Sequence, residues 1–308
     1  MSAFSPASAS LPESESRGLA RAGTVIGNYI ALTRPRVLSL VLFTAPPAMV
    51  MGHDGWPEIW VLAGVVLGAG LVGGGCGALN AWIERDRDAK MTRTQNRPLP
   101  TGRLAPRQAM SFGLAISGLG LLVLLAAGGW PTAGIGLLTL LHYIFVYTLW
   151  LKPRSAQNIV IGGAAGAASP LIADAAVDGR LGVWGIVLFA IVFLWTPPHF
   201  WAIALYRKKE YEAAGFPMMP SVVGDEACRR KMLTYALVLI PVTLLPWLGG
   251  ELGAPYALTA LAAGGGFVWS IARAIRARNR EQDRRVFATS ILYLILLFGA
   301  MLVEFGLR

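Results

Sequence analysis

Three oxygen-bearing side chains stand four residues apart near the end of a long apolar stretch: Asn80, Glu84 and Asp88. At 100° per residue of an α-helix, these positions fall on one face and lie one turn apart. Asp86 points away from that face. An amide and two carboxylates are hard oxygen ligands, which suit a Mg²⁺ ion that completes its shell with water and substrate phosphates. We therefore predict a metal site at Asn80, Glu84 and Asp88.

A basic segment, KMTRTQNRPLPTGR, follows these acids directly. Its cations are Lys90, Arg93, Arg97 and Arg103. Such residues hold a diphosphate and stabilise it as a leaving group. The simpler interpretation is a solvated loop whose acids merely balance its arginines. The N-x-x-x-E-x-x-x-D spacing and the Asn-Arg-Pro-Leu-Pro string that follows favour the functional interpretation.

His199 lies inside another apolar stretch, in the string WTPPHFW. An ionisable residue in such a segment is a functional hypothesis by default. His199 and Glu210 share a helix face, because eleven residues make almost three turns. We expect Pro197 and Pro198 to bend or unwind that helix. His199 could ligate a metal, bind a propionate or move a proton, and the alternative is a packed, hydrogen-bonded histidine. For His142, which has no acidic or proline neighbours, we expect a structural role.

A short loop at residues 151–158 offers further cations and amides, including Lys152 and Asn158. Taken alone, this pattern is not specific. The two cysteines do not indicate a site. Cys76 is a small apolar residue that packs against another helix, and Cys228 lies in a basic loop without a partner.

The elements that must position these residues are membrane helices. Of the 308 residues, 55% are hydrophobic and 14% are charged, against about 25% charged in an ordinary soluble domain. This composition excludes a disordered chain, a coiled coil and a water-soluble enzyme. A span needs about 20 mainly apolar residues. The stretches that come close are 37–52, 59–83, 109–128, 131–150, 158–173, 183–205, 232–250, 255–272 and 286–306. We therefore predict an all-α polytopic membrane protein with nine transmembrane helices.

The cations are distributed unevenly between the two ends of these spans. Of the 27 Lys and Arg residues, 25 fall in the N-terminal segment and alternate loops, and two, Arg180 and Arg308, fall on the other side. Because such an excess marks cytoplasmic loops, we predict a cytoplasmic N-terminus and a C-terminus on the far side. The asymmetry also explains the net charge of +10 without any nucleic acid as a partner.

The N-terminal segment, residues 1–28, is rich in Ser and Ala and contains Glu13 and Glu15. Transit peptides are usually poor in acids. We predict a disordered cytoplasmic tail at 1–28, with a mitochondrial transit peptide as the alternative. Residues 29–308 are predicted to form one membrane domain.

Three stretches, in this order, resemble signatures of the UbiA-type intramembrane prenyltransferases, and among these the group that farnesylates protohaem IX. They are NAWIERDRDAKMTRTQNRPLPTGR, YTLWLKPRSAQNIVIGGAAGA and FLWTPPHFWAIALYRKKEYEAAGFPMMPSVVG. The resemblance implies a UbiA-type fold, with nine helices around a central cavity that opens to lipid. It implies farnesyl diphosphate and haem B as substrates and Mg²⁺ as cofactor. It further implies a location in a bacterial inner membrane, with the mitochondrial inner membrane as the alternative. The implied partners are haem A synthase or terminal oxidase assembly factors.

The resemblance also suggests roles for single residues. The predicted catalytic residues are Asn80, Glu84, Asp88 and His199. The predicted diphosphate-binding residues are Lys90, Arg93, Arg97, Lys152, Asn158, Glu210 and Tyr211. The sequence departs from the family pattern in several places, one of which is Lys-Pro-Arg-Ser at 152–155 instead of the commoner Lys-Arg-x-Thr. Glu84 and Glu210 stand where Asp is usual, and Ala173-Asp174 replaces part of a Pro-Pro and Gly-Trp pattern that bears on acceptor contacts.

The implied reaction is an electrophilic alkylation, in which departure of diphosphate leaves an allylic farnesyl cation. The haem vinyl group attacks this cation, and water quenches the product cation. An aromatic slot of Trp195, Phe200 and Trp201 around His199 is predicted for the porphyrin. One alternative is a UbiA-type enzyme that acts on a quinone or chlorophyll precursor. Another is a transporter, although most ionisable groups lie at helix ends and no inverted repeat is visible.

Overall fold

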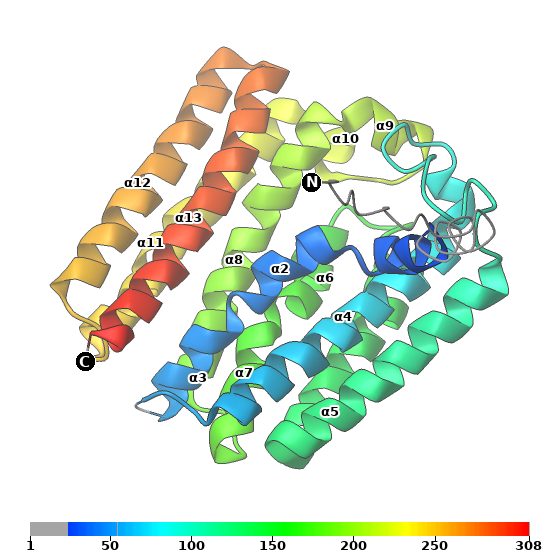
Figure 1. Ribbon diagram of the computed structural model, residues 1–308. Coiled ribbons are helices and arrows are strands. Elements are labelled where there is room, and N and C mark those ends of the chain that lie inside the picture. Colours follow the sequence, from blue (N-terminus) through cyan, green and yellow to red (C-terminus); the bar gives the residue numbers. More distant parts are fainter. Residues whose placement is uncertain (1–23, 54, 308) are drawn as a thin grey trace, which may run out of the picture.

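The computed structural model describes residues 24–53 and 55–307, and every regular element within these ranges is a helix (Figure 1). A short helix, Thr24–Thr33, comes first, so residues 24–28 are helical, although the sequence places them in the tail. The rest of the predicted tail lies outside the described residues. The helices that follow are α2 (Pro35–Leu42), α3 (Ala45–His53), α4 (Ile59–Asp88), α5 (Pro106–Leu141), η1 (His142–Leu151), α6 (Asn158–Ala167), α7 (Ser169–Asp178), α8 (Val183–Tyr206), α9 (Lys208–Ala213), α10 (Met219–Val223), α11 (Asp225–Leu248), α12 (Ala254–Ala277) and α13 (Arg280–Gly306).

Eight helical segments are long and apolar enough to cross a membrane. The longest, Pro106–Leu151, contains two of the predicted spans. Gly129 interrupts it with φ 73°, a conformation that glycine adopts without a Cβ penalty. The chain then folds back, and a Cβ on Gly136 would lie only 2.7 Å from Leu124 Cδ1. If the two halves of this hairpin are counted separately, the described part of the chain has nine apolar segments, as predicted.

The two spans that are short in sequence are each built from two helices. The first joins α2 to α3, with a break between Leu42 and Ala45. The other joins α6 to α7 at Ala168. Pro170 lies in the first turn of α7, where its missing N–H costs no helical hydrogen bond. The two composite segments, Pro35–His53 and Asn158–Asp178, are 19 and 21 residues long, which is enough to cross a membrane.

Close backbone contact joins α4 to α5, which lie side by side (Figure 1). A Cβ on Gly75 would lie 1.9 Å from Ser117 Oγ and 2.8 Å from the carbonyl oxygen of Gly113. Small residues at such interfaces let membrane helices approach closely. The position of α4, which carries the predicted acidic site, therefore depends on glycine at this contact.

A buried ion pair connects α11 with α13. Arg229 Nε lies 2.8 Å from Asp283 Oδ1, and Arg229 Nη2 lies 2.7 Å from Oδ2. The two side chains are only 5% and 1% exposed. Two parallel hydrogen bonds of this kind fix the relative orientation of both groups. The pair sets the register of α13 against the rest of the bundle.

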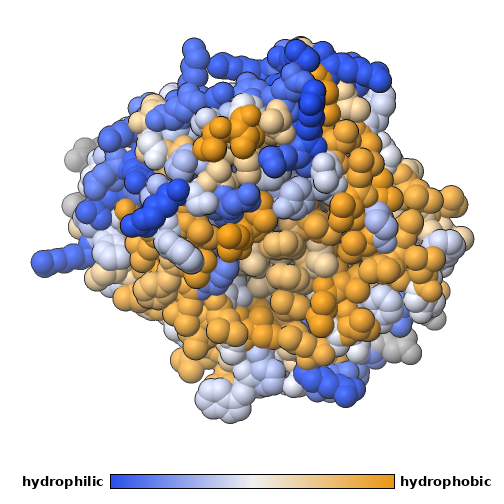
Figure 2. Space-filling view, turned by 180° about the vertical axis from the view of Figure 1, so that it is seen from behind, coloured by the Kyte–Doolittle hydropathy of each residue, from blue (hydrophilic) through white to orange (hydrophobic). Residues whose placement is uncertain are grey.

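The outer surface is that of a membrane protein. Apolar side chains form a broad belt, and hydrophilic side chains gather mainly at one end (Figure 2). In Figure 1, α9 and α10 lie at one end of the bundle, and the C-terminal end of α13 lies at the other. This arrangement agrees with the predicted charge asymmetry, while the membrane side of each end stays a prediction.

The helix α8 differs from its prediction in two respects. The sequence predicts that Pro197 and Pro198 bend or unwind the helix. The helix is continuous from Val183 to Tyr206, so it does not unwind there. In apolar surroundings the remaining backbone groups gain most by staying hydrogen-bonded within the helix. The helix ends instead at Arg207, whose φ is −113° and ψ 20°. Glu210 lies on the separate helix α9, so the prediction that it continues the face of His199 is wrong.

Candidate active site

The acidic side chains occupy the last turns of α4, on one buried face, as predicted. Asn80 is fully buried, and Glu84 and Asp88 are 6% and 4% exposed. The side chain of Asp86 is 84% exposed. The helix continues regularly to Asp88, which is why positions four apart share a face and Asp86 does not.

Each buried carboxylate is paired with a cation from another part of the chain. Lys152 Nζ lies 2.6 Å from Glu84 Oε2, and Arg97 Nη1 lies 2.8 Å from Asp88 Oδ2. Lys152 directly follows η1, and Arg97 lies in the loop between α4 and α5. Two of the predicted diphosphate-binding cations thus meet the acidic face.

Arg34 is a site residue that sequence reasoning missed. Its Nη2 donates a hydrogen bond of 2.7 Å to Asn80 Oδ1, and Asn80 Nδ2 donates to Thr148 Oγ1 at 3.2 Å. Arg34 adopts φ 53° and ψ 55° directly before Pro35. Left-handed backbone at a residue other than glycine is strained, and such residues cluster at functional sites. Sequence reasoning counts this arginine only as a loop cation. We call Arg34, Asn80, Glu84, Asp88, Arg97 and Lys152 the polar cluster.

Cations crowd one another in the polar cluster. Burial lowers the pKa of the Arg97 guanidinium, and the nearby Arg34 and Arg93 lower it further, against the opposing effect of Asp88. Like charges held together out of water repel each other, and an added anion relieves that repulsion. An anion bound beside Arg97 would relieve this repulsion.

The donor set of the polar cluster also fits a hard divalent cation. Glu84 Oε1 is buried and has no hydrogen-bond partner among the described residues, which leaves a carboxylate oxygen for a ligand. Within those residues, no three His, Cys, Asp or Glu side chains gather into a metal-binding group. The available set is one amide and two carboxylates. Mg²⁺ is commonly held by one or two carboxylates with the rest of its shell from water and phosphate.

The loop after α8 folds back onto the loop after α4. Glu210 Oε1 accepts from Arg207 Nη1 at 2.7 Å, and Glu210 Oε2 accepts from the backbone N–H of Arg93 at 3.3 Å. Tyr211 is 9% exposed, and its ring lies 6.4 Å from that of Phe216. The two loops that the sequence singles out are therefore in direct contact.

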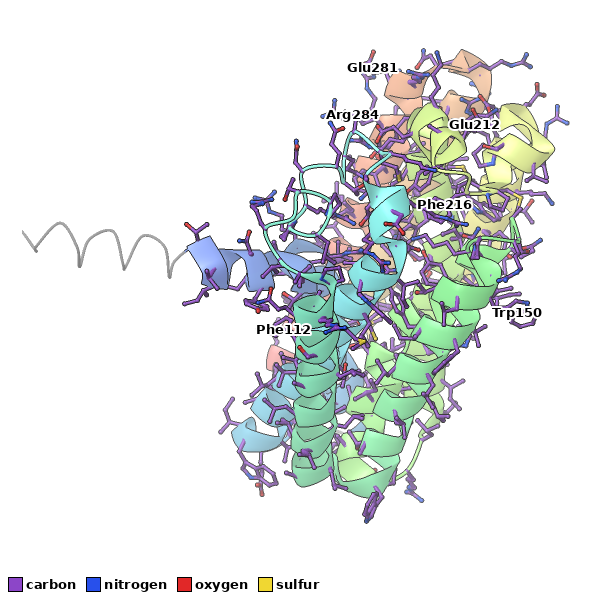
Figure 3. The ribbon with its side chains drawn as sticks, turned by 90° about the vertical axis from the view of Figure 1, so that its right-hand side faces the viewer. Phe112, Trp150, Glu212, Phe216, Glu281 and Arg284 are labelled. Atoms are coloured by element: carbon purple, nitrogen blue, oxygen red, sulfur yellow. The ribbon has the colours of Figure 1, made fainter. Side chains whose placement is uncertain are left out.

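Phe216 lies beside the end of α4, next to the polar cluster (Figure 3). Lys152 Nζ is 4.9 Å from the centre of its ring, and the Arg87 guanidinium is 4.8 Å from it. Cations over an aromatic face are attracted by its quadrupole. The aromatic ring thus holds Lys152 in place and covers one side of the cluster.

Not every predicted binding residue meets the polar cluster. Asn158 is fully buried, and its Nδ2 donates to the Ser155 carbonyl oxygen at 2.6 Å and lies 3.9 Å from Met218 Sδ. Its Oδ1 has no hydrogen-bond partner in the described ranges. Lys90 lies exposed on the surface. The Arg103 side chain bonds within its own loop.

His199 lies in an aromatic enclosure between α8 and α13. Its ring stacks on Trp195 at 4.2 Å between centroids and lies 4.8 Å from Phe287 and 5.2 Å from Phe200. Its Nδ1 is 2.7 Å from Ser290 Oγ. Phe287 and Ser290 come from α13, which no predicted motif includes, so only the tertiary structure places them here.

One member of the predicted slot lies elsewhere. Trp201 is 1% exposed and packs edge-on against Tyr235 of α11, with 5.5 Å between centroids. The prediction that Trp201 surrounds His199 is wrong, because residues two apart on a helix point 200° apart. Phe287 takes the place that the sequence assigned to Trp201.

Two further polar residues have structural partners. His142 Nε2 lies 2.9 Å from the Ile161 carbonyl oxygen, in agreement with the predicted structural role. Asp174, one of the departures from the family pattern, is buried and accepts from the Gly182 backbone N–H at 2.6 Å. That carboxylate holds the start of α8. Two surface hollows, of about 460 and 200 Å³, are lined by neither a polar-cluster residue nor His199.

Comparison with known proteins gives a consistent result. The UbiA prenyltransferase family matches residues 41–299. A protein named protoheme IX farnesyltransferase from Methylorubrum extorquens is 45% identical over 292 residues, which cover 93% of this chain and 91% of that protein. A protein of the same name from Symbiobacterium thermophilum is 43% identical over 94% of this chain and 98% of its own.

Solved structures share the fold at low sequence identity. The structure of digeranylgeranylglyceryl phosphate synthase superposes with a TM-score of 0.77 at 16% identity and covers 92% of this chain and all of that one. A UbiA homologue from Archaeoglobus fulgidus, bound to DMAPP and Mg²⁺, superposes with a TM-score of 0.63 at 17% identity, over 90% of this chain and 99% of its own. At this identity, the likeness establishes the fold alone.

Proposed function

The chain belongs to the UbiA prenyltransferase family, and from this premise we propose that it farnesylates haem B. The farnesyl group of farnesyl diphosphate is transferred to a vinyl group of protohaem IX, with addition of water, to give haem O. The choice of haem B as acceptor rests on the relatives named protoheme IX farnesyltransferase. One of them is 45% identical over 93% of the chain. A quinone or chlorophyll precursor remains the alternative acceptor.

The charges of the polar cluster support the diphosphate half of this proposal. Arg97 and Lys152 each pair with one of the two carboxylates. Arg34 hydrogen-bonds to the neutral amide of Asn80, so the six residues of the polar cluster carry one positive charge that no carboxylate of the cluster balances. A divalent metal ion and a fully ionised diphosphate ester together carry one negative charge. Binding of both therefore balances the cluster, a condition that favours burial of all these groups.

Asn80, Glu84 and Asp88 would hold Mg²⁺, with the unpartnered Glu84 Oε1 as one ligand atom. When bound, Mg²⁺ neutralises charge that develops on the departing diphosphate. Asn80 Oδ1 accepts from Arg34, Glu84 Oε2 from Lys152 and Asp88 Oδ2 from Arg97. With Mg²⁺ held by these side chains, the three cations would be available for the diphosphate oxygens. No nucleophilic side chain is required, because the vinyl group of the acceptor supplies the electrons.

The loop after α8 closes the cluster. Glu210 joins it to the loop after α4, and Phe216 packs over Lys152. Tyr211 and Phe216 are buried, so they exclude water from the side of the site where an allylic cation would form. Exclusion of water strengthens each electrostatic interaction and protects a reactive intermediate.

The protein is a multi-pass membrane protein, and we place it in a bacterial inner membrane with a cytoplasmic N-terminus and active-site loops. Its product would pass to haem A synthase or to oxidase assembly factors. Reporter fusions after residues 105 and 215 should be cytoplasmic, and a fusion after residue 252 should be on the opposite side. A fusion after residue 252 that reports cytoplasm would contradict the topology.

The function is tested by supplying purified protein with haem B, farnesyl diphosphate and Mg²⁺, and by analysing the extracted haem by mass. We expect a species heavier than haem B by one farnesyl group and the elements of water. It should disappear when the metal is chelated and in Glu84→Gln, and persist in Asp86→Asn, whose carboxylate faces away. If haem B returns unchanged while a quinone precursor becomes prenylated, the alternative acceptor is correct.

A further inference from the structure

The hydrogen bonds of Ser290 determine which nitrogen of His199 carries a proton. Ser290 Oγ donates its hydrogen to the Phe287 carbonyl oxygen at 2.6 Å. A hydroxyl group has only one hydrogen to donate. The 2.7 Å contact with His199 Nδ1 must therefore use Oγ as the acceptor and Nδ1–H as the donor. In the neutral ring, the lone pair then lies on Nε2.

A second bond holds the same segment of α13 against α8. Trp195 Nε1 donates to the Ser290 carbonyl oxygen at 2.8 Å, and the Trp195 ring stacks on His199. Ser290 thus binds both aromatic side chains, one through its hydroxyl and one through its backbone. The orientation of the His199 ring is determined by α13 as well as by its own helix.

The Nε2 atom has no hydrogen-bond partner in the part of the chain that the structure describes. The aromatic rings of Trp195, Phe200 and Phe287 surround the imidazole. The contacts of the His199 side chain in the described ranges are those with Ser290 and these three rings, and none is with a carboxylate. A proton taken up by Nε2 would create a cation without a counter-ion in an apolar part of the membrane span, which is costly. These surroundings oppose a general-base role and favour a neutral ligand.

We propose that His199 Nε2 is an axial ligand of the iron of bound haem B and that Ser290 is the positioning residue that orients it. The inference rests on the proposed function for the identity of the porphyrin. The Nε2 lone pair forms a coordinate bond to iron, and no proton or electron is transferred. A neutral imidazole with its other N–H hydrogen-bonded is the usual form of a haem-ligating histidine.

The proposal is tested by spectroscopy of haem B bound to the purified full-length protein without farnesyl diphosphate. The wild type should show an iron–histidine stretching band in resonance Raman spectra of the ferrous haem. His199→Ala should lose this band and regain it with added imidazole. Ser290→Ala should weaken haem affinity about 10–100-fold, the usual effect of removing a partner that orients a ligand. Ser290→Thr keeps the hydroxyl and should restore most of that affinity.

His142→Ala serves as the matched control, because His142 bonds to a backbone carbonyl on another span. It should leave the iron–histidine band unchanged. An unchanged band in His199→Ala would overturn the proposal. Loss of turnover in His199→Ala with the band intact would indicate a general base instead. If the wild type farnesylates haem B but shows no iron–histidine band, the axial-ligand inference is refuted and the proposed function is not. Absence of farnesylation with the band present refutes only the proposed function.

Discussion

Replacing Lys152 by methionine tests whether the polar cluster is held together by its ion pairs. Methionine keeps an unbranched stem of similar length but removes the charge that lies 2.6 Å from Glu84 Oε2. The Lys152 and Glu84 side chains are 14% and 6% exposed. Solvent therefore cannot replace the lost cation, and the Glu84 carboxylate is left buried with its main partner gone.

The size of the effect follows from this burial. Removing one partner of a buried ion pair typically destabilises a protein by about 3–5 kcal/mol, because the other charge remains uncompensated. Replacing both partners by neutral groups is often close to neutral. Lys152→Met should therefore lower the free energy of unfolding by about 3–5 kcal/mol. The double variant Glu84→Gln, Lys152→Met should recover most of that loss while lacking activity.

The assay is the free energy of unfolding of purified protein in mixed micelles titrated with SDS, without metal or substrate. Lys209→Met is the matched control, because Lys209 is exposed on α9. It should change stability by no more than about 0.5 kcal/mol. If Lys152→Met is as stable as the control, or the double variant is as unstable as the single one, the pair with Glu84 does not stabilise the fold.

Three further predictions concern the same elements. Asp88→Asn should lower turnover about 10²–10³-fold, the usual loss when a group that stabilises developing charge is removed. Asp86→Asn should keep near-normal turnover in the same assay, which is mass analysis of the product. Gly75→Ala should cost about 1–3 kcal/mol of stability, because its Cβ would meet the carbonyl oxygen of the facing helix at 2.8 Å. Gly118→Ala, which has open space, should be neutral in the same micelle titration. Asp283→Asn should cost about 3–5 kcal/mol there, because it leaves a buried arginine unpaired; a loss below about 1 kcal/mol would contradict the importance of that pair.

Helix α4 shows how far local sequence information reaches. The four-residue spacing of Asn80, Glu84 and Asp88 predicts one shared face, and the structure buries all three while exposing Asp86. The prediction succeeds because it depends only on the helical repeat and on the absence of a break before Asp88. The apolar helices lie where the sequence predicts them for the same reason, since each depends on a run of adjacent residues. Their ends differ, because Asp225–Leu248 and Arg280–Gly306 begin before the predicted stretches 232–250 and 286–306.

Helix α8 shows where such reasoning fails. The repeat predicts that Glu210 lies on the face of His199, but the helix breaks at Arg207. The break allows Glu210 to bond to Arg207 and to the backbone of Arg93. The competing interaction comes from a loop more than 100 residues earlier in the chain, so no local pattern contains it.

The sequence by itself determined the positions of the apolar segments, the acidic face of α4 and the family of the chain. Each of these depends on composition, on periodicity or on strings of neighbouring residues. Only the tertiary structure decided that Lys152 pairs with Glu84, that Arg34 binds Asn80 and that Ser290 orients His199. These contacts join residues 46 to 91 positions apart. Such contacts depend on how helices pack and where they break, which is a property of the whole bundle rather than of any one segment.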